Sequence, residues 1–277
     1  MKSFFTDLRQ YWKNRPFIWG GLEDVFMNKV NIPTCGKVLV LGPHPDDPES
    51  VAITCRLLMQ CGCDIWYAIV SISPSGVRDE HAQRWQNSDS IPLEDKKIQI
   101  RRREQIQSAE MFGLTANKLA FLCIEEDEKL DSPENRARIN NHLESLVPDI
   151  VIMPIGKDTN QTHAWVYQIF RECARDLTRK TGKPIVALYN EDPKTMEIRT
   201  DLFVLFDDES ANWKGALLRI HDSQQQRNVH MRGMGLDERI LRVNRLSYGR
   251  LSEFSIPPVL SSASYAEVFE IELFEFP

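Results

Sequence analysis

Two polar clusters in this sequence contain residue types that can bind a metal ion and move protons. The first cluster is residues 42–49, GPHPDDPE, and the second is residues 156–163, GKDTNQTH. A hydrolytic zinc site needs about three ligands from His, Asp or Glu, with one position left for water. Water bound in this way has its pKa lowered to about 7, so hydroxide forms at neutral pH. A nearby carboxylate must then accept and return a proton.

Four side chains in these clusters fit those roles. His44 and Asp47 are three residues apart on an expected strand-to-helix turn and can converge on one ion. His163 can supply the third ligand, which leaves Asp46 beside the metal as the base. Asp47 is also a good helix N-cap, and capping alone would explain its presence. Capping explains only one of the four special residues in the run 44–47, so the cluster favours metal catalysis.

The elements around both clusters alternate between strand and helix. Short apolar runs typical of buried strands are residues 38–41, 65–72, 118–124, 149–154 and 184–189. Helices are expected from Asp47 as N-cap to Gly62, over 95–112, from Ser132, and from Thr162 as N-cap. This alternation indicates βαβ units and a parallel sheet. Ligands bind at the carboxyl ends of the strands in such sheets, and each cluster directly follows an expected strand.

The two ends of the chain fit this pattern less well. Alternation loosens from about residue 200, where we expect one helix over 213–220 and a terminal strand over 268–274. Apolar residues at helical spacing near the start favour a short helix packed on the body over a helix on a membrane surface: Phe4, Phe5, Leu8, Tyr11 and Trp12. We therefore expect an N-terminal extension, residues 1–34, and a single domain, residues 35–277.

The composition is that of a globular protein of 277 residues. The chain has 34 basic and 40 acidic residues, a formal charge of -6, which gives no reason to expect nucleic acid as a partner. No apolar run approaches the roughly 18 residues of a transmembrane segment. Charged residues interrupt any signal-peptide pattern at the N-terminus. The six scattered cysteines form no CxxC motif, so we expect free thiols in a reducing compartment and a cytoplasmic protein.

A long polar stretch, residues 73–95, is expected to form a loop. Loops of this length are uncommon unless they are functional or disordered. One interpretation is a lid whose Trp85 stacks on a ring of the substrate, and the other is a mobile surface loop.

The first cluster resembles the signature of the LmbE-like, or PIG-L-type, de-N-acetylases, in which His-Pro-Asp-Asp is followed at once or after one residue by Glu. The one-residue variant stands here as residues 44–49. Residues 101–104, RRRE, and the following Phe112-Gly113-Leu114 resemble the family's Arg-x-x-Glu helix ending in Leu-Gly. Residues 214–224, 232–233 and 265–269 are similar to its C-terminal landmarks, so the resemblance spans roughly residues 36–270.

The resemblance implies a Rossmann-like α/β fold: a mostly parallel sheet with helices on both faces and an irregular C-terminal part, carrying one Zn²⁺ per chain. It implies His44, Asp47 and His163 as ligands and Asp46 as general base and acid. Arg101 is implied as a substrate-binding residue. The fit of the ligand types to zinc does not exclude iron or cobalt.

One departure from the family concerns the second cluster. Many members carry His-Pro-Asp-His around the last ligand, whereas this chain has Asn160-Gln161-Thr162-His163. An amide can donate a hydrogen bond to an oxyanion but cannot act as a general acid, so Asn160 is expected to stabilise charge while Asp46 moves both protons. Asp158 is expected on the substrate side of the site and as a partner of a ligand imidazole.

The function implied is hydrolysis of an N-acetyl group on a small substrate of the N-acetylglucosamine type. Two alternatives stay open from the sequence. One is a ligand-binding protein that keeps the fold without turnover, which the changes at Asn160 and Thr162 would suit. The other is a metal-dependent amidase acting on substrates that are not sugars. The oligomeric state is not predicted.

Overall fold

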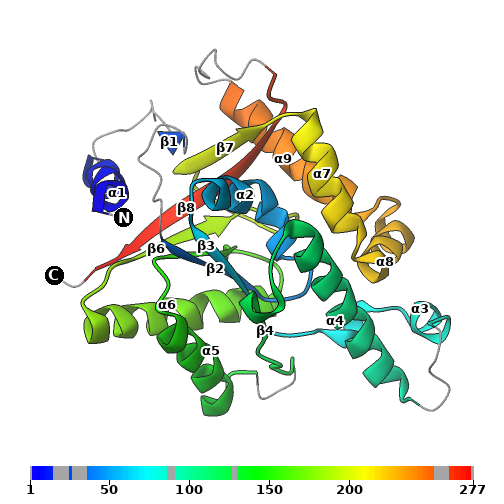
Figure 1. The fold of residues 1–277 in the computed structure, drawn as a ribbon. Coiled ribbons are helices and arrows are strands. Elements are labelled where there is room, and N and C mark those ends of the chain that lie inside the picture. Colours follow the sequence, from blue (N-terminus) through cyan, green and yellow to red (C-terminus); the bar gives the residue numbers. More distant parts are fainter. Residues whose placement is uncertain are drawn as a thin grey trace.

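A single sheet of eight strands organises the part of the chain that the computed structural model describes, namely residues 2–14, 25–26, 36–85, 91–126, 130–252 and 262–275. The strand order is β1-β7-β8-β6-β5-β2-β3-β4 (Figure 1). The strands are β1 (Val25–Phe26), β2 (Lys37–Gly42), β3 (Asp64–Ile69), β4 (Leu119–Phe121), β5 (Ile150–Pro154), β6 (Ile185–Asn190), β7 (Leu202–Phe206) and β8 (Tyr265–Phe274).

Strands β2 to β6 are parallel and form a doubly wound unit. The chain runs outward from β2 through β3 to β4, then returns to β5 on the other side of β2 and continues to β6. This reversal between β2 and β5 is a topological switch point, where the carboxyl ends of open sheets bind ligands. Both polar clusters follow these two strands, as the sequence predicted.

The helices fill the connections between the strands. They are α1 (Lys2–Asn14), η3 (Pro48–Val51), α2 (Ala52–Gln60), η4 (Pro74–Gly76), α3 (Asp79–Gln83), α4 (Leu93–Phe112), η5 (Ala116–Lys118), α5 (Pro133–Leu146), α6 (Gln161–Thr181), α7 (Asp208–Arg219), α8 (Asp222–Arg232) and α9 (Leu236–Ser252), where η marks a 3₁₀ helix.

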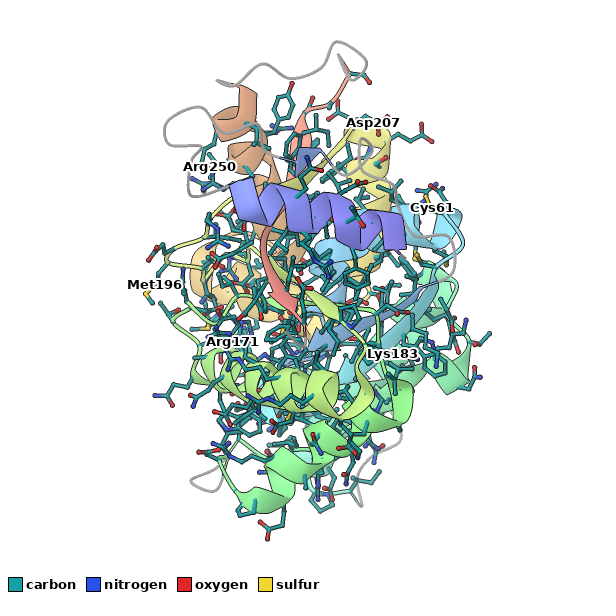
Figure 2. All side chains as sticks on the ribbon, turned by 90° about the vertical axis from the view of Figure 1, so that its left-hand side faces the viewer. Cys61, Arg171, Lys183, Met196, Asp207 and Arg250 are labelled. Carbon is teal, nitrogen blue, oxygen red and sulfur yellow. The ribbon has the colours of Figure 1, made fainter. Side chains whose placement is uncertain are left out.

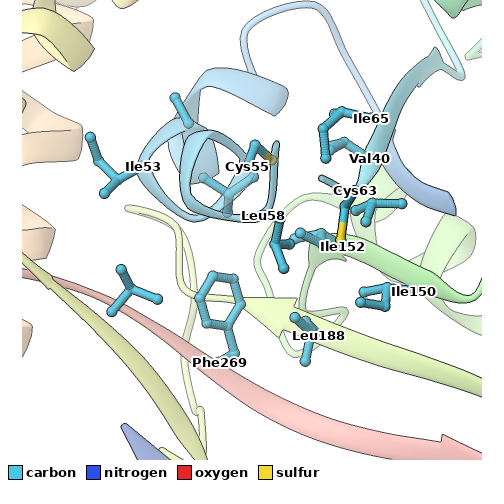
Figure 3. Close-up of a cluster of buried hydrophobic side chains, with 14 of the residues drawn as sticks. Val40, Ile53, Cys55, Leu58, Cys63, Ile65, Ile150, Ile152, Leu188 and Phe269 are labelled. Atoms are coloured by element: carbon cyan, nitrogen blue, oxygen red, sulfur yellow. The ribbon is translucent and has the colours of Figure 1, made fainter. Parts of the chain in front are cut away.

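Helices cover both faces of the sheet, and alternate residues of each strand point to opposite sides. Val38 and Val40 of β2 face a core that includes side chains of α1, α2, α4 and α7. Leu39 and Leu41 face the opposite core, built with α5 and α6. Figure 3 shows the first core, with the side chain of Leu58 in α2 directed at the strands. Burial on both faces explains why these strands are continuous apolar runs.

The C-terminal part departs from alternation, in agreement with the sequence. Three helices in succession, α7, α8 and α9, precede β8, which inserts antiparallel between β6 and β7. The helix expected over 213–220 corresponds to α7 and the terminal strand to β8. The sequence did not predict β7, α8 or α9. These elements matter because α8 and α9 line the smaller of the two cavities described below.

Helix α1 packs on the body of the protein, as its apolar spacing indicated. Phe4 and Leu8 are fully buried in the core shared with α2 and α7. In Figure 2 α1 runs across the front of the molecule. The side chains of Tyr11 and Trp12, and residues 15–24 and 27–35, lie outside the described part.

Two helix caps differ from the sequence prediction. Asp47 does not cap the helix that follows it: η3 begins there without a side-chain cap bond. The carboxylate of Glu267 in β8 instead accepts hydrogen bonds from the backbone of Ile53 (3.1 Å) and Thr54 (2.8 Å) at the start of α2. Helix α6 is capped by Asn160 rather than Thr162. Both caps depend on side chains that local sequence rules did not select.

The stretch 73–95 is not a continuous loop. It contains η4 and α3, and α4 begins at Leu93 instead of residue 95. Residues 86–90 within it lie outside the described part. The short helices give this connection a defined course against the amino-terminal half of α4.

The structure also bears on two expectations from composition, one about the cysteines and one about transmembrane segments. The five cysteines within the described residues are free thiols, and Cys35 lies outside them. Helices in the described ranges are all too short or too polar to cross a bilayer.

Candidate metal centre

Three ligand atoms meet at the carboxyl ends of β2 and β5. Nδ1 of His44 lies 3.2 Å from Nε2 of His163. Oδ2 of Asp47 lies 3.5 Å from the first nitrogen and 3.6 Å from the second. All three side chains are nearly inaccessible to solvent. The three residues predicted as ligands therefore form one compact, buried triangle.

The spacing of this triangle fits a tetrahedral metal. Bonds of about 2.0–2.1 Å at tetrahedral angles separate neighbouring ligand atoms by roughly 3.3–3.4 Å. The observed separations of 3.2, 3.5 and 3.6 Å bracket that value. One further coordination position would remain for water, which is the arrangement of a catalytic site.

Carboxylates hold the outer nitrogen of each imidazole. Nε2 of His44 lies 2.5 Å from Oε1 of Glu126, and Nδ1 of His163 lies 2.7 Å from Oδ2 of Asp158. A carboxylate only accepts, so these outer nitrogens carry the hydrogens. The inner nitrogens then point lone pairs at each other and at Asp47. Three electron-pair donors facing one another this closely form a group that can hold a cation.

The pKa shifts agree with a site that attracts positive charge. Burial alone would lower the pKa of His44, but its hydrogen bonds to Asp47 and Glu126 and their negative charges raise it to about 9. Burial would raise the pKa of Asp47, yet the charges of His163 and His44 hold it well below its ordinary value. Both shifts have the sign expected where positive and negative charges stabilise one another.

Asp46 stands next to the triangle but outside it. Its Oδ1 accepts a hydrogen bond from Nη2 of Arg101 at 2.5 Å. Burial raises the pKa of Asp46, against the opposing charge of Arg101. The backbone of Asp46 has a φ of 91°, a conformation that costs a residue with a side chain about 1–3 kcal/mol. This turn lets the adjacent carboxylates of Asp46 and Asp47 line the same cavity.

Helix α4 holds the Asp46 turn from one side. Arg101 also donates to the backbone oxygens of Pro45 (2.6 Å) and Ser73 (3.2 Å). Four residues later on the same face, Gln105 accepts from the backbone nitrogen of Asp46 at 3.1 Å. The predicted Arg101 is thus buried and fixed against the site. It is not part of a solvated row of arginines.

The motif residue Glu49 lies behind this turn. Its Oε1 accepts hydrogen bonds from Gln105 (3.0 Å) and Ser108 (2.6 Å), and its Oε2 lies 3.3 Å from Nε2 of His221. Glu49 and His221 are both almost completely buried. The last residue of the motif therefore ties the turn to α4 and to the start of α8.

The turn itself needs close backbone packing. A Cβ on Gly42, the last residue of β2, would lie 3.0 Å from Cδ of Pro48 and 3.1 Å from the backbone oxygen of His44. Pro48 begins η3, where its missing N–H costs nothing. Glycine and proline thus let the chain fold back tightly enough to bring His44 beside Asp47.

A polar cavity of about 230 Å³ opens onto these side chains. His44, Asp46, Asp47 and Asn160 line it. Asn160 uses its Oδ1 to cap α6, accepting from the backbone of Thr162 (2.9 Å) and His163 (3.4 Å). Capping leaves the amide NH₂ of Asn160 as the group that can donate toward a ligand.

The structure brings together seven of the eight predicted site residues. Asp158 contacts the imidazole of His163, as expected. Trp85 is the exception, because it packs against the small apolar cluster of Val77, Ala82 and Ile100 and does not line the cavity. A stacking role for Trp85 gains no support from this position.

Sequence reasoning missed two carboxylates near the imidazoles. Glu126 follows β4, and Asp192, whose Oδ2 lies 4.0 Å from Nδ1 of His163, follows β6. Both come just after the carboxyl end of a parallel strand, which is the signal that could have identified them.

The comparisons with known proteins agree with this geometry. Residues 39–174 match the family model described as PIG-L, GlcNAc-PI de-N-acetylase. Those residues run from β2 into α6 and so include the whole ligand triangle. No curated protein sequence matches the chain.

Several solved structures share the fold. N,N'-diacetylchitobiose deacetylase from Pyrococcus horikoshii is 17% identical, with a TM-score of 0.62, over 86% of this chain and 84% of that one. The 4-carboxy-2-hydroxymuconate hydratase GalB from Pseudomonas putida is 21% identical, with a TM-score of 0.63, over 87% and 97%. A zinc-inhibited form of teicoplanin deacetylase is 15% identical, with a TM-score of 0.55, over 87% and 98%.

At these identities the structures establish the fold, while the sequence match and the motif establish the relationship. The resemblance first seen at residues 44–49 is confirmed, and residues 39–174 of the chain match the domain of the PIG-L, or LmbE-like, family.

Proposed function

We propose that this protein is a zinc-dependent de-N-acetylase acting on a small molecule that contains an N-acylated amino sugar. The observation that carries the proposal is the buried triangle of His44, Asp47 and His163, with separations of 3.2–3.6 Å. The match to the PIG-L family model supports deacetylation as the reaction.

Zinc suits the triangle because it accepts two imidazole nitrogens and one carboxylate in a tetrahedral arrangement. When bound, it would supply a Lewis acid for the amide carbonyl and a water of lowered pKa. The hydrogen bonds from His44 to Glu126 and from His163 to Asp158 orient the rings for this role.

The chain's own groups would move the protons. Asp46 takes a proton from the attacking water and returns it to the departing amine. Arg101 holds the carboxylate of Asp46 in position through its hydrogen bond. The NH₂ of Asn160 donates to the carbonyl oxygen as negative charge develops there.

The sugar part of the proposal rests on relatives rather than on this site. The structurally similar deacetylases act, by their names, on diacetylchitobiose and teicoplanin. The similar hydratase catalyses another reaction on the same fold, so acetate release is the property that separates hydrolysis from hydration.

The test is acetate release by the metal-loaded protein from N-acetylglucosamine, N,N'-diacetylchitobiose and a non-sugar acetanilide. We expect release from the sugars, and a loss of about 10²- to 10⁴-fold in kcat for Asp46→Asn. Zinc is added at one equivalent and in excess, because a relative has a zinc-inhibited form. Acetate release from the anilide alone would favour the amidase alternative. A chain that binds zinc and sugar without releasing acetate would favour the ligand-binding alternative.

A further inference from the structure

Basic side chains gather beside the candidate metal centre. Arg227 and Arg232 of α8, Arg239 of α9 and Lys194 after β6 line a second, smaller cavity of about 50 Å³. This cavity adjoins the first one, because both are lined by Asp46, Asp47, Lys194, Gln224 and Arg227. Positive charge therefore lies directly next to the proposed reaction centre.

The three arginines form no ion pair within the part of the chain that the structure describes. None of the acidic groups there lies within 4.0 Å of the guanidinium nitrogens of Arg227, Arg232 or Arg239. Arg239 and Arg232 instead donate to the amide Oδ1 of Asn228, at 2.6 and 3.4 Å. An amide oxygen holds the two guanidinium groups without forming an ion pair with either.

The nearby carboxylates are already engaged elsewhere. Asp46, Asp47 and Asp192 also line this cavity. Asp46 pairs with Arg101, Asp47 faces the imidazoles of His44 and His163, and Oδ2 of Asp192 lies 4.0 Å from Nδ1 of His163. A divalent metal in the triangle would add two further positive charges beside the basic group. The surplus of positive charge is thus larger in the loaded protein than in the bare chain.

Holding these charges together is unfavourable without a counter-ion. Arg227 is half-buried, and its burial together with the charges of Arg101 and Arg232 lowers its pKa. Burial and the charge of Arg232 likewise lower the pKa of Arg239, against the opposing charges of Asp192 and Asp46. A bound anion would relieve this repulsion, since charge-assisted hydrogen bonds to guanidinium are among the stronger contacts in proteins.

The two helices hold this group at a fixed position. Gln224, Arg227 and Asn228 share one face of α8, at spacings of three and four residues. Nε2 of Gln224 donates to the backbone oxygen of Gly76 at 3.0 Å, which fastens α8 to the wall of the metal-side cavity. Arg227 and Arg239 are therefore half-buried parts of the cavity wall, whereas Arg232, at the end of α8, is exposed.

We propose that Arg227, Arg232 and Arg239, with Lys194, form an anion-binding subsite, so that the preferred substrate carries a carboxylate or phosphate group close to its acylated nitrogen. The statement about substrate rests on the proposed deacetylase function. The statement about anion binding does not, because these side chains bind an anion with or without catalysis.

Binding to the metal-free protein tests the subsite without turnover. Isothermal titration with inorganic phosphate, N-acetylglucosamine 6-phosphate, N-acetylmuramic acid and N-acetylglucosamine compares phosphate, carboxylate and uncharged probes. We expect the charged sugars to bind at least tenfold more tightly than N-acetylglucosamine, and Arg227→Gln/Arg239→Gln to lose on the order of tenfold in that affinity. Arg242→Gln, an exposed arginine of α9 outside both cavities, is the matched control.

A second variant keeps every guanidinium in place. Asn228→Asp changes one amide into a carboxylate between Arg232 and Arg239 and neutralises part of the group. We expect weaker binding of the charged sugars together with unchanged or greater thermal stability. Undiminished anion affinity in both this variant and the double arginine variant would overturn the subsite.

Turnover separates the subsite from the deacetylase proposal. The expected result is that kcat/KM for N-acetylglucosamine 6-phosphate or N-acetylmuramic acid exceeds that for N-acetylglucosamine, and that this ratio falls on the order of tenfold in Arg227→Gln/Arg239→Gln. Equal turnover of charged and neutral sugars would overturn the substrate preference while the deacetylase stands. Anion binding through the arginines without acetate release from any sugar would leave the subsite standing and overturn the deacetylase.

Discussion

The carboxylate of Asp158 lies 2.7 Å from Nδ1 of His163, and neither side chain has any exposed surface. The pair fixes the ring so that Nε2 of His163 lies 3.2 Å from Nδ1 of His44, although the two residues are 119 positions apart in the sequence. A buried carboxylate behind an imidazole also makes the ring a better electron donor to a cation.

Replacing this carboxylate should weaken metal binding without removing a ligand. In Asp158→Asn the amide can turn its NH₂ toward Nδ1 of His163 and so favours the wrong tautomer. We expect a 10- to 100-fold loss of zinc affinity, measured by competition with a chromogenic chelator. His230→Gln, an exposed histidine of α8, is the control. Unchanged affinity in Asp158→Asn would mean that His163 does not need its buried partner.

Asp46 should be separable from metal binding. Asn is close to Asp in shape and can still accept from Arg101, so Asp46→Asn should bind zinc as tightly as the original chain. Its kcat should fall about 10²- to 10⁴-fold because the amide cannot serve as the general base of the proposed mechanism. Zinc content and single-turnover acetate release on one sample check both statements. Equal loss of metal and activity would instead make Asp46 a fourth ligand.

Gly76 should be required for the position of Arg101. A Cβ at Gly76 would lie 2.5 Å from Nη1 of Arg101 and 3.3 Å from Nε2 of Gln224. Gly76→Ala should push the guanidinium off Asp46 and reduce kcat by about tenfold or more while zinc binding persists. Gly249→Ala on α9, where an added Cβ meets nothing within 4 Å, is the matched control. Full activity in Gly76→Ala would show that the backbone turn at Gly76 can shift to make room for the added Cβ.

The buried ion pair of Lys214 and Glu267 should support the fold beneath the motif. Nζ of Lys214 donates to Glu267 (2.7 Å), to Asn244 (2.8 Å) and to the backbone oxygen of Ser50 (2.5 Å), and both charged groups are almost fully buried. Lys214→Met leaves the carboxylate unpaired and should lower the free energy of unfolding by about 3–5 kcal/mol, measured by urea denaturation.

The exposed pair of Arg179 and Asp176 provides the comparison for that measurement. Arg179→Met should change the free energy of unfolding by no more than about 1 kcal/mol, because solvent screens the pair. Similar losses of unfolding free energy in both variants would mean that burial does not determine how much the ion pair of Lys214 and Glu267 stabilises the protein.

The triangle of candidate ligands was predictable because its signal is local. His44 and Asp47 fall within one turn directly after an apolar strand, and His163 follows another, so strand alternation alone places them at the same edge. The two roles of Asp47 were not separable from sequence, because Asp suits both an N-cap and a metal ligand. A distant residue, Glu267, decides between them by capping α2 instead.

The rest of the site depends on contacts that no short segment encodes. Glu126 and Asp192 are each a single acidic residue after a strand. The chain has many other acidic residues, so this position alone did not identify them. Arg227 and Arg239 line the smaller cavity, and they belong to helices α8 and α9, which precede a strand that inserts antiparallel into the sheet. Trp85 suggested a sugar contact, but an apolar cluster at the start of α4 takes up its ring.

Equilibrium dialysis against zinc, with metal counted by mass spectrometry, tests the central claim most directly. The account predicts one tightly bound zinc per chain, and a loss of at least a hundredfold in affinity for His163→Ala, which removes one of the three ligands. A chain that binds no zinc, or a His163→Ala variant that binds it as tightly as the original chain, would contradict the metal centre.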